Sequence, residues 1–293
     1  MDLPGRAGAA TGIVSPEPRA RVPVFVSLTT LPSRIARLRP TVDSLKAQTL
    51  PPDRIFVCVP DRSLREDRGY TLPEWLRPAP PGVEVVRCGS DHGPGTKLLG
   101  CLPRITGEAC LITVDDDLVY RPFLVERLYR AQLDRPASSF SFFVYDVGRF
   151  RCGQSADGFS FWTPNLARVE AFATRALRSP HLFVQDDLWI SLYLQNEGIT
   201  LASLQHTLPP DQFVWERQTH RDGQLGQLDG FLRRSIVMRE GTRFLVRTRT
   251  LGARLRRLYW LGRWDHLRAR VERRLRAAAS RVGLLRHARR RAR

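Results

Sequence analysis

Apolar residues in the first half of the chain form short runs separated by helical spacings. Four runs rich in β-branched and apolar residues predict strands, at residues 22–28, 54–59, 83–86 and 109–114. Apolar positions three and four residues apart predict helices over 34–47 and 123–131. Strands that alternate with helices in this way favour an α/β fold, with a mostly parallel sheet flanked by helices.

The C-terminal part of the chain has a different pattern. From Leu251 to Leu285, apolar residues recur every three or four positions, which predicts one long amphipathic helix or two helices broken near Gly262. Arginines fill the opposite face of this predicted helix. Three aromatic residues accompany the apolar stripe: Tyr259, Trp260 and Trp264.

Composition and charge divide the chain in the same way. The 293 residues are 42% hydrophobic and 26% charged, which excludes collagen-like, low-complexity and wholly disordered proteins. Of the formal net charge of +18, residues 239–293 carry +16, from 19 arginines and three acidic residues. We therefore expect a flexible leader over 1–20, a near-neutral α/β domain over 21–238 and an Arg-rich helical tail over 239–293.

The tail predicts a peripheral protein at an anionic membrane surface, because basic amphipathic helices with aromatic residues bind such surfaces. Alternatively, its apolar stripe packs on the domain or on a second copy of the chain. No nucleic-acid recognition motif is visible, so no specific nucleic acid partner is expected.

Compartment is predicted from three features. The longest run without Asp, Glu, Lys or Arg has 13 residues, at 198–210, and is too short to span a bilayer. The first 20 residues contain no apolar signal-peptide core, and the five cysteines are typical of reduced thiols. The expected location is cytoplasmic, on the inner face of the cell membrane.

Three consecutive carboxylates, Asp115, Asp116 and Asp117, follow the fourth predicted strand. Ligands of open α/β sheets bind beyond the carboxyl ends of strands, where this triplet is expected. Two carboxylates about 5 Å apart repel by roughly 3 kcal/mol at an effective dielectric of about 20, and a divalent cation removes that penalty. Oxygen ligands suit Mg²⁺ or Mn²⁺. The alternative is a solvated acidic turn in which one aspartate caps a helix.

Two further segments carry candidate chemistry. A Gly-Pro-Gly turn at 93–95 precedes Lys97, one of only two lysines in the chain, at a predicted helix start that can hold an anion. A plain turn with a surface lysine is the alternative. Asp186 and Asp187 precede an apolar run of helical length, so they are expected at a helix N-terminus, either as caps or with one acting as a general base.

The order of these motifs resembles that of family 2-like glycosyltransferases of the GT-A fold, over roughly residues 22–235. Four segments carry the resemblance: VSLTTLPSRI at 26–35, GPGTKLL at 93–99, ITVDDD at 112–117 and QDDLWIS at 185–191. The triplet matches the DXD signature of that family, and the later pair matches its acidic base motif. Because Gln-Asp-Asp stands where Glu-Asp is common, both aspartates of the pair are candidates.

The resemblance implies roles for individual residues in donor binding. Thr29 and Asp61, after the first two strands, are expected to hold the nucleotide base, and Lys97 lies in the segment that closes over the nucleotide. Asp115 is expected to meet the ribose, with Asp116 in the same nucleotide site.

The resemblance also implies a metal site and a catalytic base. Asp117, together with Asp115, is expected to bind Mg²⁺ or Mn²⁺ bridging the diphosphate, with His220, or alternatively His206, as a third ligand. Asp187 is the expected catalytic base. Asp186 is expected to shape its environment, and the aromatic segment at 157–162 to face the acceptor.

The function implied is a metal-dependent inverting glycosyltransferase. It would move a sugar from a nucleotide sugar to a sugar or lipid-linked hydroxyl acceptor, in cell-surface glycan or glycolipid synthesis. Two alternatives stay open: a nucleotidyltransferase on a similar sheet, and a catalytically degenerate domain that binds membrane or RNA.

Overall fold

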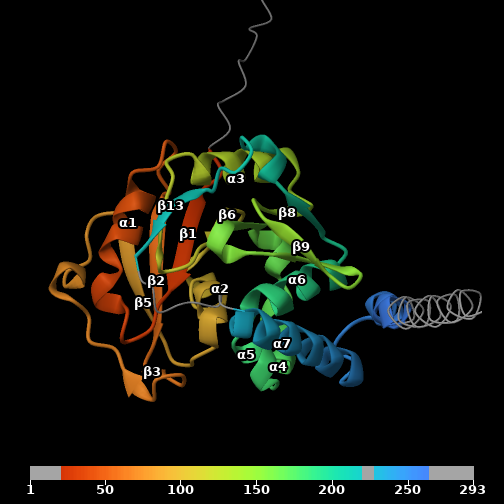
Figure 1. Ribbon diagram of the computed structural model, residues 1–293. Coiled ribbons are helices and arrows are strands. Elements are labelled where there is room, and N and C mark those ends of the chain that lie inside the picture. Colours follow the sequence, from red (N-terminus) through yellow and green to blue (C-terminus); the bar gives the residue numbers. More distant parts are fainter. Residues whose placement is uncertain (1–20, 220–227, 264–293) are drawn as a thin grey trace, which may run out of the picture.

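Seven strands form the central sheet, in the order β12-β8-β11-β6-β1-β2-β5 (Figure 1). The computed structural model describes residues 21–219 and 228–263. β11 runs antiparallel to β6 and β8, and the other neighbouring pairs are parallel, so the predicted α/β fold with a mostly parallel sheet is confirmed. The strands are β1 (Val24–Thr29), β2 (Arg54–Pro60), β5 (Val83–Cys88), β6 (Cys110–Thr113), β8 (Ser138–Ser141), β11 (Phe159–Trp162) and β12 (Thr200–Ser203).

Alternation along the central strands divides the core into two layers. In β1, Val24 and Val26 point into one apolar cluster, while Phe25 packs against the other. In β6, Ile112 and Leu111 divide in the same way. Side chains in a strand alternate between faces, so near-continuous apolar runs are what a sheet covered on both sides requires.

Helices cover both faces of the sheet (Figure 1). One layer packs under α1 (Arg39–Lys46) and α3 (Leu124–Asp134), whose apolar residues join the cluster of Val24. The opposite layer contains apolar residues of α4 (Val169–Ala176), α5 (Pro180–Phe183), α6 (Asp186–Asn196) and α7 (Leu228–Arg247). Three short two-stranded antiparallel sheets lie at the margins: the hairpin β3–β4 (Arg62–Ser63 and Arg68–Gly69), the pair β7–β13 from distant parts of the chain (Leu118–Tyr120 and Trp215–Gln218) and the hairpin β9–β10 (Val144–Val147 and Phe150–Gly153).

The structure refines one of the predicted helices and adds strands that were not predicted. The helix predicted over 34–47 is a 3₁₀ turn at Ile35–Arg37 followed by α1. Pro40 explains the break, because proline lacks the amide hydrogen that a continuing helix needs but fits a first turn. β8 was not predicted, because its sequence Ser-Ser-Phe-Ser lacks the usual apolar signal.

The start of the C-terminal region packs on the domain. The predicted boundary at 238–239 falls inside α7, and Leu245 and Leu251 are fully buried in the core. Residues 253–263 are helical, and Leu255 is also buried, whereas Trp260 is 54% exposed. The described part of the predicted apolar stripe, residues 251–263, therefore packs on the domain at Leu251 and Leu255, and the rest lies outside the described residues. In the ranges that the structure describes, no helix has both the length and the apolar character needed to cross a membrane.

Candidate active site

A cavity of about 990 Å³ lies at the carboxyl ends of β1 and β6. Thr29 ends β1, and the aspartate triplet follows β6 after Val114. The structure brings seven of the predicted residues to this strand-end cavity: Thr29, Lys97, Asp115, Asp116, Asp117, Asp186 and Asp187. The two acidic motifs, some 70 residues apart in the chain, thus line one cavity.

The three aspartates of the triplet have different surroundings. Asp116 is buried, with one carboxylate oxygen accepting a hydrogen bond from Thr30 Oγ1 at 2.5 Å and the other paired with Arg34 Nη1 at 3.0 Å. Asp117 Oδ2 lies 3.9 Å from the same guanidinium nitrogen, beyond hydrogen-bonding distance. The middle aspartate therefore anchors the loop through both of its carboxylate oxygens, whereas the ion pair of Asp115 with Lys97 involves Oδ1. Asp115 and Asp117 are thus the better placed donors of carboxylate oxygens.

Lys97 joins the two acidic motifs. Its side chain is only 3% exposed, and its Nζ lies 2.6 Å from Asp115 Oδ1 and 3.2 Å from Asp186 Oδ2. Burial by itself lowers the pKa of Lys97, but three neighbouring carboxylates outweigh burial and hold that pKa well above its ordinary value. A charged ammonium thus offsets the repulsion between carboxylates that a buried acidic site would otherwise suffer.

The Gly-Pro-Gly turn has a packing role. Gly93 has a φ of +61°, and a β-carbon there would lie 2.1 Å from the carbonyl oxygen of Phe183 at the end of α5. A β-carbon on Gly95 would lie 2.8 Å from the Trp189 ring of α6. α2 (Thr96–Leu99) has four residues, and the glycines let it approach α5 and α6 closely enough for Lys97 to reach Asp186.

Asp187 lies in the first turn of α6, as predicted, and is 9% exposed. The backbone N–H of Ser155 donates a hydrogen bond to Asp187 Oδ1 at 3.0 Å, which orients the carboxylate. Burial and the adjacent Asp186 raise the pKa of Asp187 to about 7. A carboxylate with this pKa is suited to exchange protons near neutral pH.

Other predicted residues are not brought to the cavity. Asp61 is exposed after β2, and His206 is exposed in a 3₁₀ turn; neither lines the cavity. His220 lies outside the described residues. The expectation of acceptor-facing aromatic residues in 157–162 is wrong for Phe159 and Phe161, which are fully buried in β11 because a central strand is covered on both faces.

The aromatic residues that do line the cavity come from segments that we did not single out. Phe213 is 57% exposed and stacks on Trp215, with ring centroids 4.8 Å apart, in the segment leading into β13. Phe143, 39% exposed, precedes β9. An exposed aromatic ring beside a charged cavity offers a surface on which a sugar or an apolar group can pack. These residues were not predicted, because single aromatic residues in loops produce no periodic pattern in a sequence.

The carboxylates at the cavity fit a divalent cation that takes its remaining ligands from a substrate. Within the described ranges, no three His, Cys, Asp or Glu side chains gather as a metal site on their own. Asp115 and Asp117 still supply carboxylates, and burial together with the neighbouring aspartates raises the pKa of Asp117 to about 6. The repulsion that remains beside Lys97 and Arg34 suits Mg²⁺, which typically takes one or two protein carboxylates plus substrate phosphates and waters.

Comparisons with known proteins identify the family and the fold of the chain. The family model described as glycosyl transferase family 2 matches residues 31–183, just over half of the 293-residue chain. The match includes the triplet and ends before Asp186. No curated protein matches the chain.

Among solved structures, 117 chains match. One is the mannosyltransferase PcManGT from Pyrobaculum calidifontis in complex with GDP-Man and Mn²⁺, with 16% identity and a TM-score of 0.53, covering 80% of this chain and 67% of that one. At this identity the likeness establishes the fold, which is GT-A. With the family match extending over more than half of its length, the chain belongs to glycosyl transferase family 2 and is a glycosyltransferase.

Proposed function

We propose that this chain catalyses the metal-dependent transfer of a sugar from a nucleotide sugar to an acceptor hydroxyl, with inversion at the anomeric carbon, in cell-surface glycan or glycolipid synthesis. The observation that carries the proposal is the position of Lys97, whose ammonium contacts Asp115 and Asp186 at 2.6 and 3.2 Å. This contact joins the two acidic motifs, so that in this proposal one motif binds the sugar donor and the other faces the acceptor.

Asp115 and Asp117 form the donor side of the cavity. In this proposal they hold Mg²⁺ or Mn²⁺ together with the diphosphate of the donor, and the cation, when bound, stabilises negative charge on the leaving nucleoside diphosphate. Asp116 and Arg34 fix the loop that carries both carboxylates. The complex of PcManGT with GDP-Man and Mn²⁺ supports a nucleotide-sugar donor on this fold.

Asp187 forms the acceptor side. Its carboxylate, oriented by the Ser155 N–H at 3.0 Å, accepts the proton of the attacking hydroxyl. A pKa of about 7 lets it take that proton at neutral pH without being fully protonated beforehand. Attack from the side opposite the leaving group is a single displacement, which inverts the anomeric carbon.

A panel of sugar nucleotides tests the proposal. We expect one nucleotide sugar to raise the melting temperature only with Mn²⁺ or Mg²⁺, since a ligand at 100 times its Kd stabilises a protein by about 2.7 kcal/mol. Incubation with acceptors should then release a nucleoside diphosphate. Release of pyrophosphate instead would favour the nucleotidyltransferase alternative, and the absence of metal-dependent binding to any sugar nucleotide would favour the degenerate domain.

A peripheral location on an anionic membrane surface forms part of the same proposal. Its basis is the Arg-rich segment after residue 239, of which the described part presents Trp260 and Leu261 as exposed apolar residues. Truncation after residue 263 keeps the buried Leu251 and Leu255, so the domain should stay folded. We expect the truncated chain to sediment less with anionic liposomes than the full chain; equal sedimentation would contradict a role for residues 264–293.

A further inference from the structure

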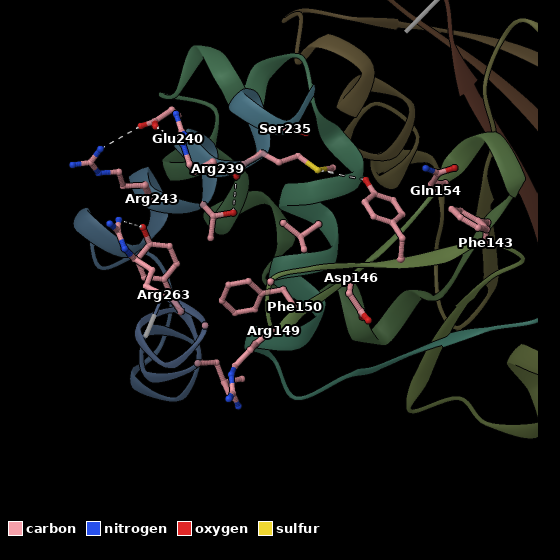
Figure 2. A pocket seen from close by; sticks show the side chains of 18 residues that line it. Phe143, Asp146, Arg149, Phe150, Gln154, Ser235, Arg239, Glu240, Arg243 and Arg263 are labelled. Atoms are coloured by element: carbon pink, nitrogen blue, oxygen red, sulfur yellow. Dashed lines mark hydrogen bonds and ion pairs between the residues drawn. The ribbon is translucent and has the colours of Figure 1, made fainter. Parts of the chain in front are cut away.

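A second cavity, of about 1100 Å³, lies between the β9–β10 hairpin and the C-terminal helices (Figure 2). We call it the hairpin groove; its apolar lining comes from Tyr145, Val147, Phe150, Met238, Leu258 and Tyr259. None of the aspartates assigned above lines it. The groove shares Phe143 and Gln154 with the strand-end cavity, so the two spaces adjoin at these residues.

An aromatic wall continues from the junction into the groove. The ring of Phe143 stacks on that of Tyr145, with centroids 6.1 Å apart and an interplanar angle of 27°. The hydroxyl of Tyr145 donates to Met238 Sδ of α7 at 3.7 Å, which ties the hairpin to the helix across the groove. Tyr145 and Val147 thus continue the apolar surface of Phe143 from the edge of the strand-end cavity along the hairpin, beside the polar lining residues Asp146 and Arg149.

The other end of the groove is positively charged. Figure 2 shows Arg239, Arg243 and Arg263 on the side opposite Phe143 and Gln154. The accompanying carboxylate, that of Glu240, lies 3.0 Å from Arg239 Nε and 3.7 Å from Arg243 Nη1. Three guanidinium groups beside one carboxylate leave this end with a net positive charge.

Exposed apolar residues adjoin this positive end. Trp260 and Leu261 lie in the chain between the groove residues Tyr259 and Gly262, and are 54% and 38% exposed. Ile236, next to Ser235 of the groove lining, is 49% exposed. Exposed apolar side chains among arginines suit the interface of an anionic lipid surface.

We propose that the hairpin groove binds the apolar chain of a lipid-linked acceptor. This inference rests on the function proposed above and names its acceptor class. The acceptor hydroxyl enters the strand-end cavity past Phe143, the chain lies along Tyr145 and Val147, and it leaves past the arginines toward an anionic bilayer. The charge of the exit and the continuity with the strand-end cavity favour this occupant over a second protein, which would not need a path to Asp187.

Alkyl maltosides of increasing chain length test the groove with a constant, uncharged sugar headgroup. Below their micellar concentrations, we expect calorimetric affinity for the full-length chain to rise from hexyl to dodecyl maltoside. The increment should approach fourfold for each buried methylene, the ratio that the transfer free energy of a methylene predicts. Chain-length independence in the unmodified protein would overturn the proposal.

Val147→Asp and Leu258→Glu place a charge on opposite walls of the groove, so each should abolish the chain-length dependence. Leu64→Asp is the matched control, since Leu64 is 64% exposed and lines neither cavity. Unchanged chain-length dependence in both groove variants would contradict the proposal.

Metal-dependent stabilisation by the sugar nucleotide, measured on the same samples, reports folding and the donor site. If the unmodified protein and all variants lack this metal-dependent stabilisation but affinity still depends on chain length, the proposed donor function is overturned and the groove remains a chain-binding site. Its retention in the two groove variants, with chain-length dependence lost, is the result that supports both.

Discussion

The strand-end cavity and the hairpin groove are built in different ways. The cavity contains charged groups that are buried and already paired, such as Lys97, at 3% exposure, between Asp115 and Asp186. The groove contains apolar side chains with an exposed aromatic edge, Phe143, and paired arginines at its outer end. Buried charge needs fixed partners, whereas apolar surface tolerates varied occupants. In the proposed function, reaction chemistry is therefore assigned to the strand-end cavity and acceptor choice to the hairpin groove.

The largest expected effect falls on turnover, at the strand-end cavity. Asp187→Asn removes the proposed base and should lower kcat by about 10² to 10⁴-fold, the usual contribution of a placed proton acceptor. Metal-dependent binding of the sugar nucleotide should persist, because the proposal places Asp187 on the acceptor side. Asp186→Asn is the comparison variant: a larger loss in Asp186→Asn than in Asp187→Asn would exchange the two roles.

The next effect concerns stability. Lys97→Met leaves the carboxylates of Asp115 and Asp186 without their buried counter-charge, and breaking such a pair costs about 3–5 kcal/mol. Chemical denaturation should show this loss in the free energy of unfolding. Lys46→Met is the control, since Lys46 is the other lysine of the chain and is exposed. Equal losses of stability from both substitutions would contradict the role of Lys97 as the buried counter-charge of the two acidic motifs.

A smaller effect should follow from overpacking the Gly-Pro-Gly turn, which precedes α2 and packs against α6. A β-carbon on Gly95 would lie 2.8 Å from Trp189, so Gly95→Ala should destabilise the fold by about 1–3 kcal/mol. Gly89→Ala is matched to it, because a β-carbon at Gly89 meets nothing within 4 Å. Thermal or urea unfolding distinguishes the two variants, and a Gly95→Ala protein as stable as Gly89→Ala would mean that the turn relaxes freely.

The pH dependence should be the mildest signature. Asp187 acts as a base only when deprotonated, and burial with the adjacent Asp186 raises its pKa to about 7. The value of kcat/KM should therefore be constant above about pH 7 and fall about tenfold for each unit below it. Asp186→Asn removes a neighbouring negative charge and should move this limb to lower pH. A profile that stays flat down to pH 5 would be inconsistent with Asp187 as the base.

The same contrast explains what could be predicted from the sequence. Strands β1, β2, β5 and β6 and both acidic motifs are contiguous runs, so periodicity and position after a strand were enough to find them. The fold-back of Lys97 onto Asp186 depends on Gly93 and Gly95 packing against α5 and α6, a tertiary contact that no local pattern specifies. The hairpin groove is assembled from residues about 90 apart in the chain, such as Tyr145 and Met238, and had no sequence signal.

The surroundings of Asp116 and Asp61 could not be predicted from the family resemblance. The resemblance implies that both bind nucleotide, which stays a prediction. In the structure, Thr30 and Arg34 contact the carboxylate of Asp116 at the cavity, and Asp61 does not line the cavity. A sequence motif predicts the position of a backbone segment in the fold, but not the side-chain contacts of each of its residues. Which of its carboxylates is available depends on partners such as Arg34, which come from other segments.

Calorimetric titration of the sugar nucleotide, with Mn²⁺, into Asp117→Asn and Asp187→Asn tests the central claim most directly, namely that two acidic motifs divide donor and acceptor chemistry within one cavity. The account predicts that Asp117→Asn loses the metal-stimulated part of donor affinity and that Asp187→Asn retains it. Full metal-stimulated affinity in Asp117→Asn, or an equal loss in both variants, would contradict the account.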